Sequence, residues 1–280
     1  MKIARNRQLI GPLLTGFVFI TLYCSVLIWL VGAWLYNPYY SHGFLILPVA
    51  VFVAWTRRKE LVRVKPYLTG IIVLAIGLAT YVAGFAWKIY SLSAFSLLAV
   101  AFGLVLYIFG TKAARSMAFP ICFLIFMIPL PFIDSMSIPL QSITASVSAS
   151  IVLALGIPAT RTGVEIYLSE ATFIIGTPCS GMNTLISLLA LTTLFLYFVK
   201  APFYKKVSLF LLTFPIAILA NIFRISLLLV IAYYLGADAA QRYFHDFSNL
   251  LLFVLAVALL ILLAKVLRCK IGTLTELING

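Results

Sequence analysis

The feature that most limits what this chain can fold into is a succession of long apolar runs separated by clusters of Lys and Arg. About 20 apolar residues are needed to cross roughly 30 Å of hydrocarbon. Such windows fall near residues 12–34, 44–56 (short), 68–86, 93–110, 116–133, 179–198, 207–235 and 247–267. Hydrophobic residues make up 64% of the 280 and charged residues 10%, which excludes an ordinary soluble globule. The sequence therefore predicts an all-α polytopic membrane bundle with about eight transmembrane helices, as one integral membrane domain over residues 1–280.

The basic residues orient this bundle, because Lys and Arg gather in cytoplasmic loops. With the N-terminus inside, most of the 20 basic residues fall on the inner face, namely Lys2, Arg5, Arg7, Arg57, Arg58, Lys59, Arg63, Lys65, Lys112, Arg115, Lys200, Lys205, Lys206, Lys265, Arg268 and Lys270. Both termini are then cytoplasmic. The formal net charge of +13 follows from topology and does not indicate nucleic-acid binding.

One further segment, residues 137–156, is long enough to span but repeats a polar stripe at helical spacing, Ser137, Gln141, Thr144 and Ser148. Its opposite stripe is apolar, Leu140, Ile143, Val147 and Ile151. If this segment crossed, the basic residues 200–206 would land outside. We therefore expect an amphipathic helix that lies on the outer surface or re-enters. Residues 163–168 and 172–176, rich in β-branched and aromatic residues around a polar turn at 169–171, predict a small β-hairpin on the outer face.

The hairpin leads to Cys179, which lies where a loop ends and a long apolar helix starts, within residues 176–183. Free backbone N–H groups and the helix dipole at such a position favour a thiolate and stabilise an oxyanion. The position is that of a nucleophile. The plain alternative is a small apolar residue of a membrane helix, which is what we expect of Cys24 and Cys122.

Arg224 lies deep inside the window 207–235, with Asn221 three residues earlier on the same helix face. A buried arginine in a membrane helix costs about 3 kcal/mol or more, so it must face water, a partner or a substrate. The alternative is a structural arginine that binds helix-end carbonyls. For Arg224 to reach Cys179, the site must be a water-filled pocket between the sixth, seventh and eighth spans.

The chain has two histidines, and histidine is the usual general base near neutral pH. His245 lies where an outer loop enters the last span, and His42, in another outer loop, is its rival. The alternatives are a solvated interfacial residue for His245 and a turn or substrate-binding element for His42. No motif of a metalloprotease, a serine hydrolase or a phosphate-binding loop is present in the sequence, so we expect no metal site.

Three short segments occur in this order: Pro178–Gly181, Asn221–Arg224 and Phe244–His245. Earlier segments, Tyr40–Phe44 and Trp55–Arg58, accompany them. Together they resemble the exosortase/archaeosortase family of membrane cysteine transpeptidases, over about residues 40–267, and His245 resembles the bacterial exosortase branch.

The resemblance implies that Cys179 is the nucleophile, Arg224 the transition-state stabiliser and His245 the acid/base. Asn221, Ser180 and His42 are the expected substrate-binding residues, and no cofactor is expected. The implied partners are membrane-anchored proteins with a C-terminal sorting tail of the PEP-CTERM kind, which the enzyme cuts and sorts to the surface. The implied location is the bacterial inner membrane, with the site facing the periplasm or exterior.

Two other classes of function stay open from the residues alone. In a transporter or lipid-handling protein, Arg224 binds an anionic substrate and Cys179 is incidental, so Cys179→Ala keeps function. A structural assembly factor tolerates the loss of either residue. The sorting motif, the acceptor, the oligomeric state and the choice between hydrolysis and transpeptidation are not fixed by the sequence.

Overall fold

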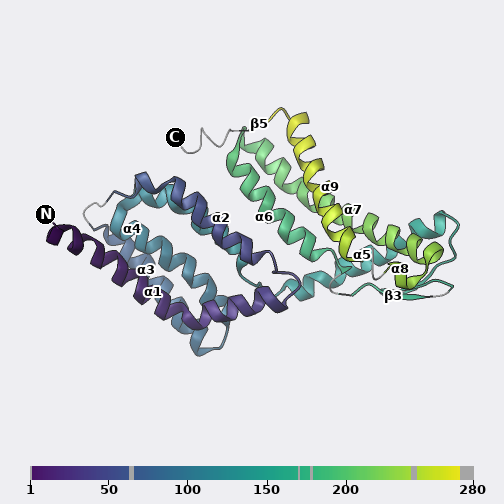
Figure 1. Ribbon diagram of the computed structural model, residues 1–280, viewed down its shortest axis with the longest axis horizontal. Coiled ribbons are helices and arrows are strands. Elements are labelled where there is room, and N and C mark those ends of the chain that lie inside the picture. Colours follow the sequence, from purple (N-terminus) through teal and green to yellow (C-terminus); the bar gives the residue numbers. More distant parts are fainter. Residues whose placement is uncertain (1, 63–65, 170, 177–178, 241–244, 272–280) are drawn as a thin grey trace. The chain divides into compact units, whose positions relative to one another are not determined.

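The computed structural model describes residues 2–62, 66–169, 171–176, 179–240 and 245–271, with the side chains of 2–14, 245–252 and 270–271 outside that description. The chain divides into two compact units, Met1–Pro129 and Leu130–Gly280. Both are mainly helical (Figure 1). The single domain expected from the sequence stays a prediction.

The first unit is a set of apolar helices. Its elements are α1 (Lys2–Tyr36), α2 (Gly43–Thr56), the 3-10 turn η1 (Arg58–Glu60), α3 (Leu68–Ala86), α4 (Tyr90–Phe123) and the 3-10 turn η2 (Leu124–Met127). Tyrosine hydroxyls join three of the helices: Tyr23 Oη lies 2.8 Å from Ser96 Oγ, and Tyr81 donates to the carbonyl of Leu22 at 2.7 Å. Such bonds between helices stabilise a bundle that has no water to compete for them.

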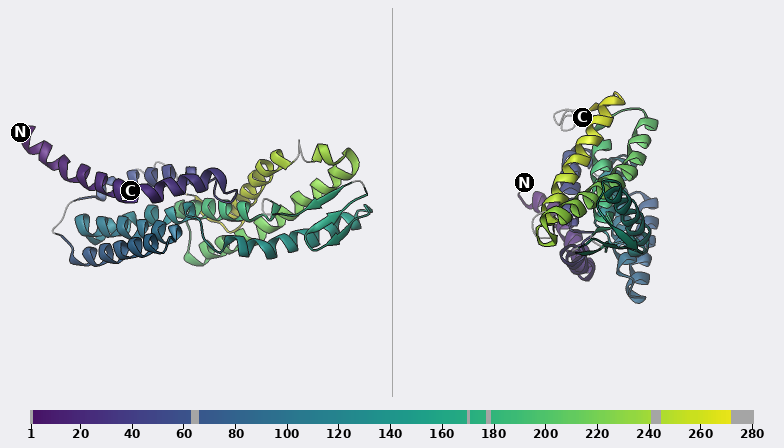
Figure 2. Two further views of the ribbon diagram at one scale, coloured as in Figure 1. Left: turned by 90° about the horizontal axis from the view of Figure 1, so that it is seen from below. Right: turned by 90° about the vertical axis from the view of Figure 1, so that its right-hand side faces the viewer.

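Helices α3 and α4 pack closely along their length, as both figures show (Figures 1 and 2). The cause is a row of buried glycines in α3, Gly70, Gly77 and Gly84, spaced seven residues apart. A Cβ added at Gly70 would lie 2.5 Å from the backbone nitrogen of Tyr107. Small residues at such spacing let two backbones approach, which is how membrane helices gain packing energy.

Helix α4 bends at Gly110, where φ is 76° and ψ is −174°. Only glycine adopts this backbone conformation without strain. The break falls where the sequence separates the windows 93–110 and 116–133, so α4 consists of two helical segments that meet at Gly110.

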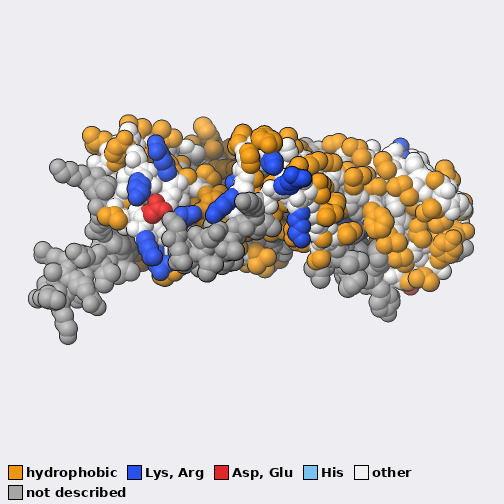
Figure 3. Space-filling view, turned by 90° about the horizontal axis from the view of Figure 1, so that it is seen from above, with side chains coloured by type: hydrophobic (Ala, Val, Ile, Leu, Met, Phe, Trp, Pro, Cys, Tyr) orange, Lys and Arg blue, Asp and Glu red, His pale blue; other side chains and the backbone are white. Residues whose placement is uncertain are grey.

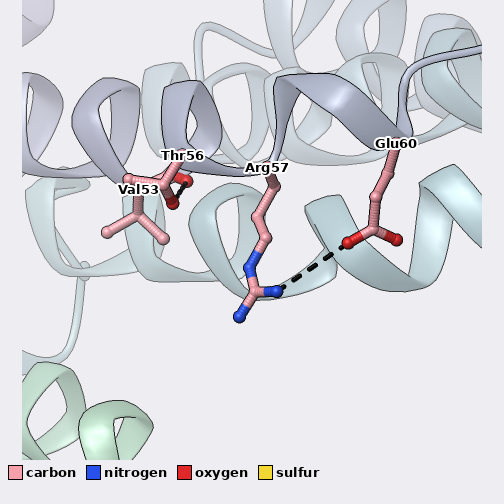
Figure 4. Close-up of polar contacts among 4 residues, drawn as sticks. All are labelled: Val53, Thr56, Arg57 and Glu60. Carbon is pink, nitrogen blue, oxygen red and sulfur yellow. Dashed lines mark hydrogen bonds and ion pairs between the residues drawn. The ribbon is translucent and has the colours of Figure 1, made fainter. Parts of the chain in front are cut away.

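The C-terminal end of α2 is polar. Arg57 forms an ion pair with Glu60 at 3.8 Å, and Thr56 Oγ1 donates to the carbonyl of Val53 at 2.7 Å (Figure 4). The Arg58 guanidinium lies 4.6 Å from the centre of the Trp55 ring. A half-exposed pair of this kind adds little stability, but cations at a helix C-terminus interact favourably with its dipole. In the space-filling view of Figure 3, Lys and Arg side chains lie among hydrophobic side chains.

The second unit contains a helical bundle and a small sheet. Its elements are α5 (Ile133–Ala154), β1 (Thr160–Thr162), β2 (Glu165–Tyr167), β3 (Thr172–Ile174), α6 (Met182–Phe198), β4 (Val199–Lys200), α7 (Phe203–Leu235), α8 (Ala237–Ala239), α9 (His245–Val266) and β5 (Lys270–Ile271). Helices α6 and α9 both pack on α7 (Figure 1). The C-terminal ends of α6 and α9 lie together, because β4 follows α6, β5 follows α9, and these two strands pair in antiparallel fashion.

Lysines hold this end of the second unit together. Lys205 Nζ donates to the carbonyl of Leu267 at 2.7 Å, and Lys206 Nζ to that of Leu196 at 2.9 Å. Both acceptors are last-turn carbonyls, which lack helical partners and attract cations. The basic ends of α6 and α9 therefore lie together, and Cys179 and the start of α9 lie toward the other end of the bundle.

Helix α5 differs from the surface helix expected for residues 137–156. Its polar stripe is buried, with Ser137, Thr144 and Ser148 each at most 2% exposed, whereas the apolar Ile143 and Val147 are 45% and 39% exposed. The polar face packs against α7, where its hydroxyls find hydrogen-bond partners. A helix with its polar side inward and its apolar side outward suits contact with lipid.

The sheet has the order β1-β2-β3 with antiparallel neighbours. The strands β2 and β3 fall within the two segments where the sequence predicts a hairpin, and β1 is an additional strand. Buried Ile166 and Phe173 pack with Ile225 and Leu229 of α7 and with Val152 of α5 in one hydrophobic cluster. The sheet therefore covers the C-terminal half of α7 and positions the loop that follows β3.

Five helices of the described residues are long and apolar enough to cross a membrane, Thr15–Tyr36, Leu68–Ala86, Tyr90–Met127, Ile133–Ala154 and Phe203–Leu235. Three shorter apolar helices are Gly43–Thr56, Met182–Phe198 and Phe253–Val266. These lengths support a multi-pass membrane protein. The eight crossings and their orientation stay predictions.

Candidate active site

The loop before α6 places Cys179 beside the first turn of that helix. The Cys179 N–H donates to the carbonyl of Gly176 at 3.0 Å, and the buried Ser180 hydroxyl accepts the N–H of Met182 at 3.2 Å. Two of the amides expected to hold an oxyanion are thus already bonded. Ser180 therefore provides an acceptor for the first amide of α6, a structural role different from the substrate binding expected from the sequence.

Gly181 precedes α6 with φ at 81°, in the left-handed region. A Cβ at this position would lie 2.8 Å from Cγ of Asn221. The absence of a side chain therefore serves two purposes: it permits the turn into α6 and lets the loop rest directly on Asn221.

We expect Gly181→Ala to lower the free energy of unfolding by about 2–5 kcal/mol, from left-handed strain of about 1–2 kcal/mol and overpacking of about 1–3 kcal/mol. Gly156→Ala is the matched control, because Gly156 has φ at 82° and nothing within 4 Å of an added Cβ. The loss of stability in Gly156→Ala should therefore come from backbone strain alone. Thermal unfolding of the detergent-solubilised variants measures the difference; equal destabilisation would show that the contact with Asn221 does not matter.

Asn221, on α7, ties the cysteine loop to two helices. Its side chain is 2% exposed. Nδ2 donates to the carbonyl of Cys179 at 3.0 Å and to Thr144 Oγ1, on α5, at 3.2 Å. Loop, α5 and α7 therefore meet at this amide.

Arg224 lies one turn further along the same helix and is only 3% exposed. Its Nε and Nη2 are buried without a hydrogen-bond partner among the described residues. Buried donors that stay unpaired cost about 1–3 kcal/mol each, and more when charged. In the structural alternative, the arginine would bind helix-end carbonyls. Neither Nε nor Nη2 binds such a carbonyl among the described residues. Both donors are available for an acceptor outside the described residues.

Burial raises the pKa of the Cys179 thiol, and the positive charge of Arg224 opposes this rise. The net direction is upward, which corrects the expectation that the helix start would favour the thiolate. Desolvation disfavours the charged form more than the cation favours it. Burial therefore opposes formation of the thiolate, and a base that takes the thiol proton would assist a reaction at this sulfur.

His245 is the first residue of α9, but its side chain lies outside the described residues. Its role as the base stays a prediction. The water-filled pocket expected between the sixth, seventh and eighth spans also stays a prediction. A groove of about 300 Å³ does lie beside the site, between α5 and α7, and its lining is almost entirely apolar, including Ile151, Ile222 and Phe223.

Arg224 lies far from either end of α7, whereas Cys179 lies just before the start of α6. The unequal lengths of α6 and α7 explain how the two can meet. Asn221 reaches the Cys179 loop, yet α7 continues for fourteen more residues to Leu235, about 21 Å at 1.5 Å per residue. The stretch from Phe203 to Asn221 covers about 27 Å, close to the thickness of the hydrocarbon core. An arginine in the middle of a long helix can therefore meet a cysteine at the mouth of a short one.

His42 belongs to the first unit, where it precedes α2. Its Nε2 lies 3.1 Å from the carbonyl of Phe126, and its ring stacks on Tyr40 with centroids 5.9 Å apart. Burial lowers the pKa of His42, and the bond to Phe126 opposes this shift. A second ring in this unit also bonds to a backbone carbonyl of η2: Trp34 Nε1 donates to the carbonyl of Met127 at 2.8 Å. These bonds support the alternative of a turn element for His42.

Thr144 was missed as a site residue by the sequence reasoning, although the polar stripe of residues 137–156 contains it. The signal was present: hydroxyls spaced three or four residues apart on an apolar helix need partners inside the protein. Among the described residues, no three potential metal ligands lie close enough together to hold an ion.

The fold and the site together define a multi-pass membrane protein in which Asn221 holds a cysteine-bearing loop and a buried arginine lies one helical turn further along the same helix. The family model described as "Transmembrane exosortase" matches residues 34–262. The chain therefore belongs to the transmembrane exosortase family, and this membership supports a membrane transpeptidase role. No curated protein and no solved structure gave a significant match.

Proposed function

We propose that the protein is a membrane-embedded cysteine endopeptidase and transpeptidase whose nucleophile is Cys179. The observation that carries the proposal is Arg224, a buried guanidinium with two donors that have no partner in the described part of the chain. It lies one helical turn from Asn221, which binds the carbonyl of Cys179. Donors that are already desolvated and aimed at a developing negative charge lower a reaction barrier strongly.

In this mechanism His245 takes the proton of the Cys179 thiol, and the sulfur attacks the carbonyl carbon of a peptide bond. Arg224 stabilises the resulting oxyanion. The tetrahedral intermediate collapses, the C–N bond breaks, and His245 returns the proton to the leaving amine. Water or an amine then attacks the thioester and releases the thiol. The raised pKa of Cys179 is consistent with this scheme, since a base then assists the loss of the thiol proton.

The substrates in this proposal are exported proteins anchored by a C-terminal tail of the PEP-CTERM kind, in a bacterial inner membrane with the site facing outward. Family membership supports protein substrates within the bilayer. The arrangement of the second unit is consistent with the orientation, because its lysine-rich end and the Cys179 loop lie toward opposite ends of α6.

The test is cleavage of a purified tail-bearing substrate by the full-length protein in lipid vesicles. A sorting tail of this kind consists of a short motif such as Pro-Glu-Pro, a membrane span and a basic cluster. The control substrate lacks the motif and the basic cluster but keeps the membrane span. Cleavage of the first and not the second supports a tail-directed peptidase. Failure to cleave any tailed substrate, with anion transport by the same vesicles, would favour the transporter.

The histidine assignment gives a further prediction. We expect His245→Ala to lower cleavage by about 10²–10³-fold, the usual effect of a general acid/base. His42→Ala should keep cleavage within about threefold and lower the melting temperature, because its ring nitrogen is bonded to Phe126. Single-turnover rates and thermal unfolding separate the two effects. Full activity in both variants would remove histidine from the mechanism.

A further inference from the structure

The hydroxyl face of α5 meets α7 next to the candidate active site. Thr144 and Ser148 are 1% and 0% exposed. Ser148 Oγ donates to the carbonyl of Ile222 at 3.2 Å, and Thr144 Oγ1 accepts the amide of Asn221 at 3.2 Å. The first bond fixes the helix backbone beside Asn221, and the second fixes its side chain.

These contacts determine which way the Asn221 amide faces. The Cys179 carbonyl can only accept, so Nδ2 must point toward it. The second N–H of Nδ2 is taken by Thr144. Both donors of the amide are therefore used, and Oδ1 is left buried without a hydrogen-bond partner among the described residues.

The unpaired groups of Asn221 and Arg224 form a complementary set. Residues three apart on a helix are neighbours on its surface, so the same face of α7 carries one acceptor, Oδ1, and two donors, Nε and Nη2, that have no partner among the described residues. A peptide backbone presents N–H donors and C=O acceptors, and it matches such a set. A carboxylate or a phosphodiester matches the arginine alone, because neither carries a proton to donate to Oδ1.

We propose that Thr144 is a positioning residue, which holds the Asn221 amide so that Oδ1 accepts a backbone N–H of the substrate peptide while Arg224 binds the carbonyl. The proposal rests on the proposed function, since it concerns the same site. Two features are new: Thr144 orients the Asn221 amide, and this amide binds a backbone N–H of the substrate. Recognition of the backbone leaves sequence selectivity to other contacts.

Three substitutions separate this role from ordinary packing. Thr144→Val keeps the volume and removes the acceptor, whereas Thr144→Ser keeps the hydroxyl. Thr192→Val is the matched control: Thr192 is also 1% exposed, and its hydroxyl accepts that of Thr213 at 3.2 Å. It lies ten residues into α6 from Met182, about 15 Å along the helix.

The first measurement is peptide cleavage by the full-length protein in vesicles. A bond to the substrate N–H exists before and during the reaction, so its loss raises KM and spares kcat. We expect Thr144→Val to raise KM about tenfold with kcat within about threefold, Thr144→Ser to restore KM to within about threefold, and Thr192→Val to change neither. An unchanged KM in Thr144→Val overturns the proposal, and so does an equal rise in Thr192→Val.

The second measurement needs no substrate and follows alkylation of Cys179 by iodoacetamide, quantified by mass spectrometry of its peptide. Release of the amide frees the Cys179 carbonyl and loosens the loop, so Thr144→Val should react about fivefold faster than wild type, with Thr144→Ser and Thr192→Val unchanged. Equal rates overturn the positioning role. If no variant cleaves peptide but the alkylation rates differ as stated, the proposed function and the peptide-binding role of Oδ1 fail, and the orienting role of Thr144 stands.

Discussion

Replacing Cys179 with alanine should abolish processing of a tailed substrate, with a loss of at least about 10⁴-fold in kcat. The reason is that the proposed reaction forms a bond to this sulfur, and no other group in the described site supplies a nucleophile. The variant should fold normally, since the bonds from the loop to Gly176 and Asn221 are made by backbone atoms of Cys179, which alanine keeps. The readout is accumulation of uncleaved, membrane-retained substrate.

Cys122→Ala is the control for this experiment, because Cys122 is an exposed cysteine in α4 of the first unit. It should process substrate at the wild-type rate. The transporter alternative predicts the opposite for Cys179: full function in Cys179→Ala. That outcome, in a protein with an unchanged melting temperature, would end the thiol-enzyme account.

Replacing Arg224 with methionine or glutamine should lower kcat by about 10²–10³-fold, the typical effect of removing an oxyanion donor. The same change should keep or raise the melting temperature. A buried charge whose Nε and Nη2 lack partners is a cost to the folded state, and Met of similar size relieves it. Loss of activity with gain of stability is the signature of a functional group. A structural arginine would give the reverse, a clear loss of stability.

The rate at which Cys179 is alkylated in the Arg224→Gln variant gives an independent test of the charge of Arg224. The Arg224 charge lowers the pKa of Cys179 against the effect of burial, so its removal should raise that pKa further. Only the thiolate reacts with iodoacetamide, and its alkylation at pH 8 should therefore slow. Thr192→Val serves as the control and should leave the rate unchanged. A faster reaction in Arg224→Gln would show that the loop has opened.

Much of the architecture was predictable, because lipid imposes strong rules on sequence. Apolar runs of span length and the positions of the lysines predict helices and a polarity along the chain. The arginine in the window 207–235 drew attention for the same reason, since a charge in hydrocarbon needs a function or a partner. The loop at Cys179 was predictable from the break before an apolar run.

The placement of α5 was not predictable from its pattern alone. Polar residues at Thr144 and Ser148 fit a helix on the membrane surface, with those residues in water, equally well as a helix with those residues turned inward. The choice depends on acceptors on α7, which lie more than seventy residues away along the chain. The raised pKa of Cys179 was missed for a related reason: a helix dipole is visible in the sequence, whereas burial arises from packing.

The central claim is that a peptide carbonyl becomes bonded to the sulfur of Cys179 beside Arg224. Its most direct test is to mix the vesicle-bound protein with a tailed substrate, quench in acid within the first turnover, and determine which residue carries added mass. The account predicts a thioester between Cys179 and the N-terminal fragment of the substrate, which disappears on treatment with hydroxylamine. Cleavage that proceeds through the first turnover with Cys179 unmodified would contradict it.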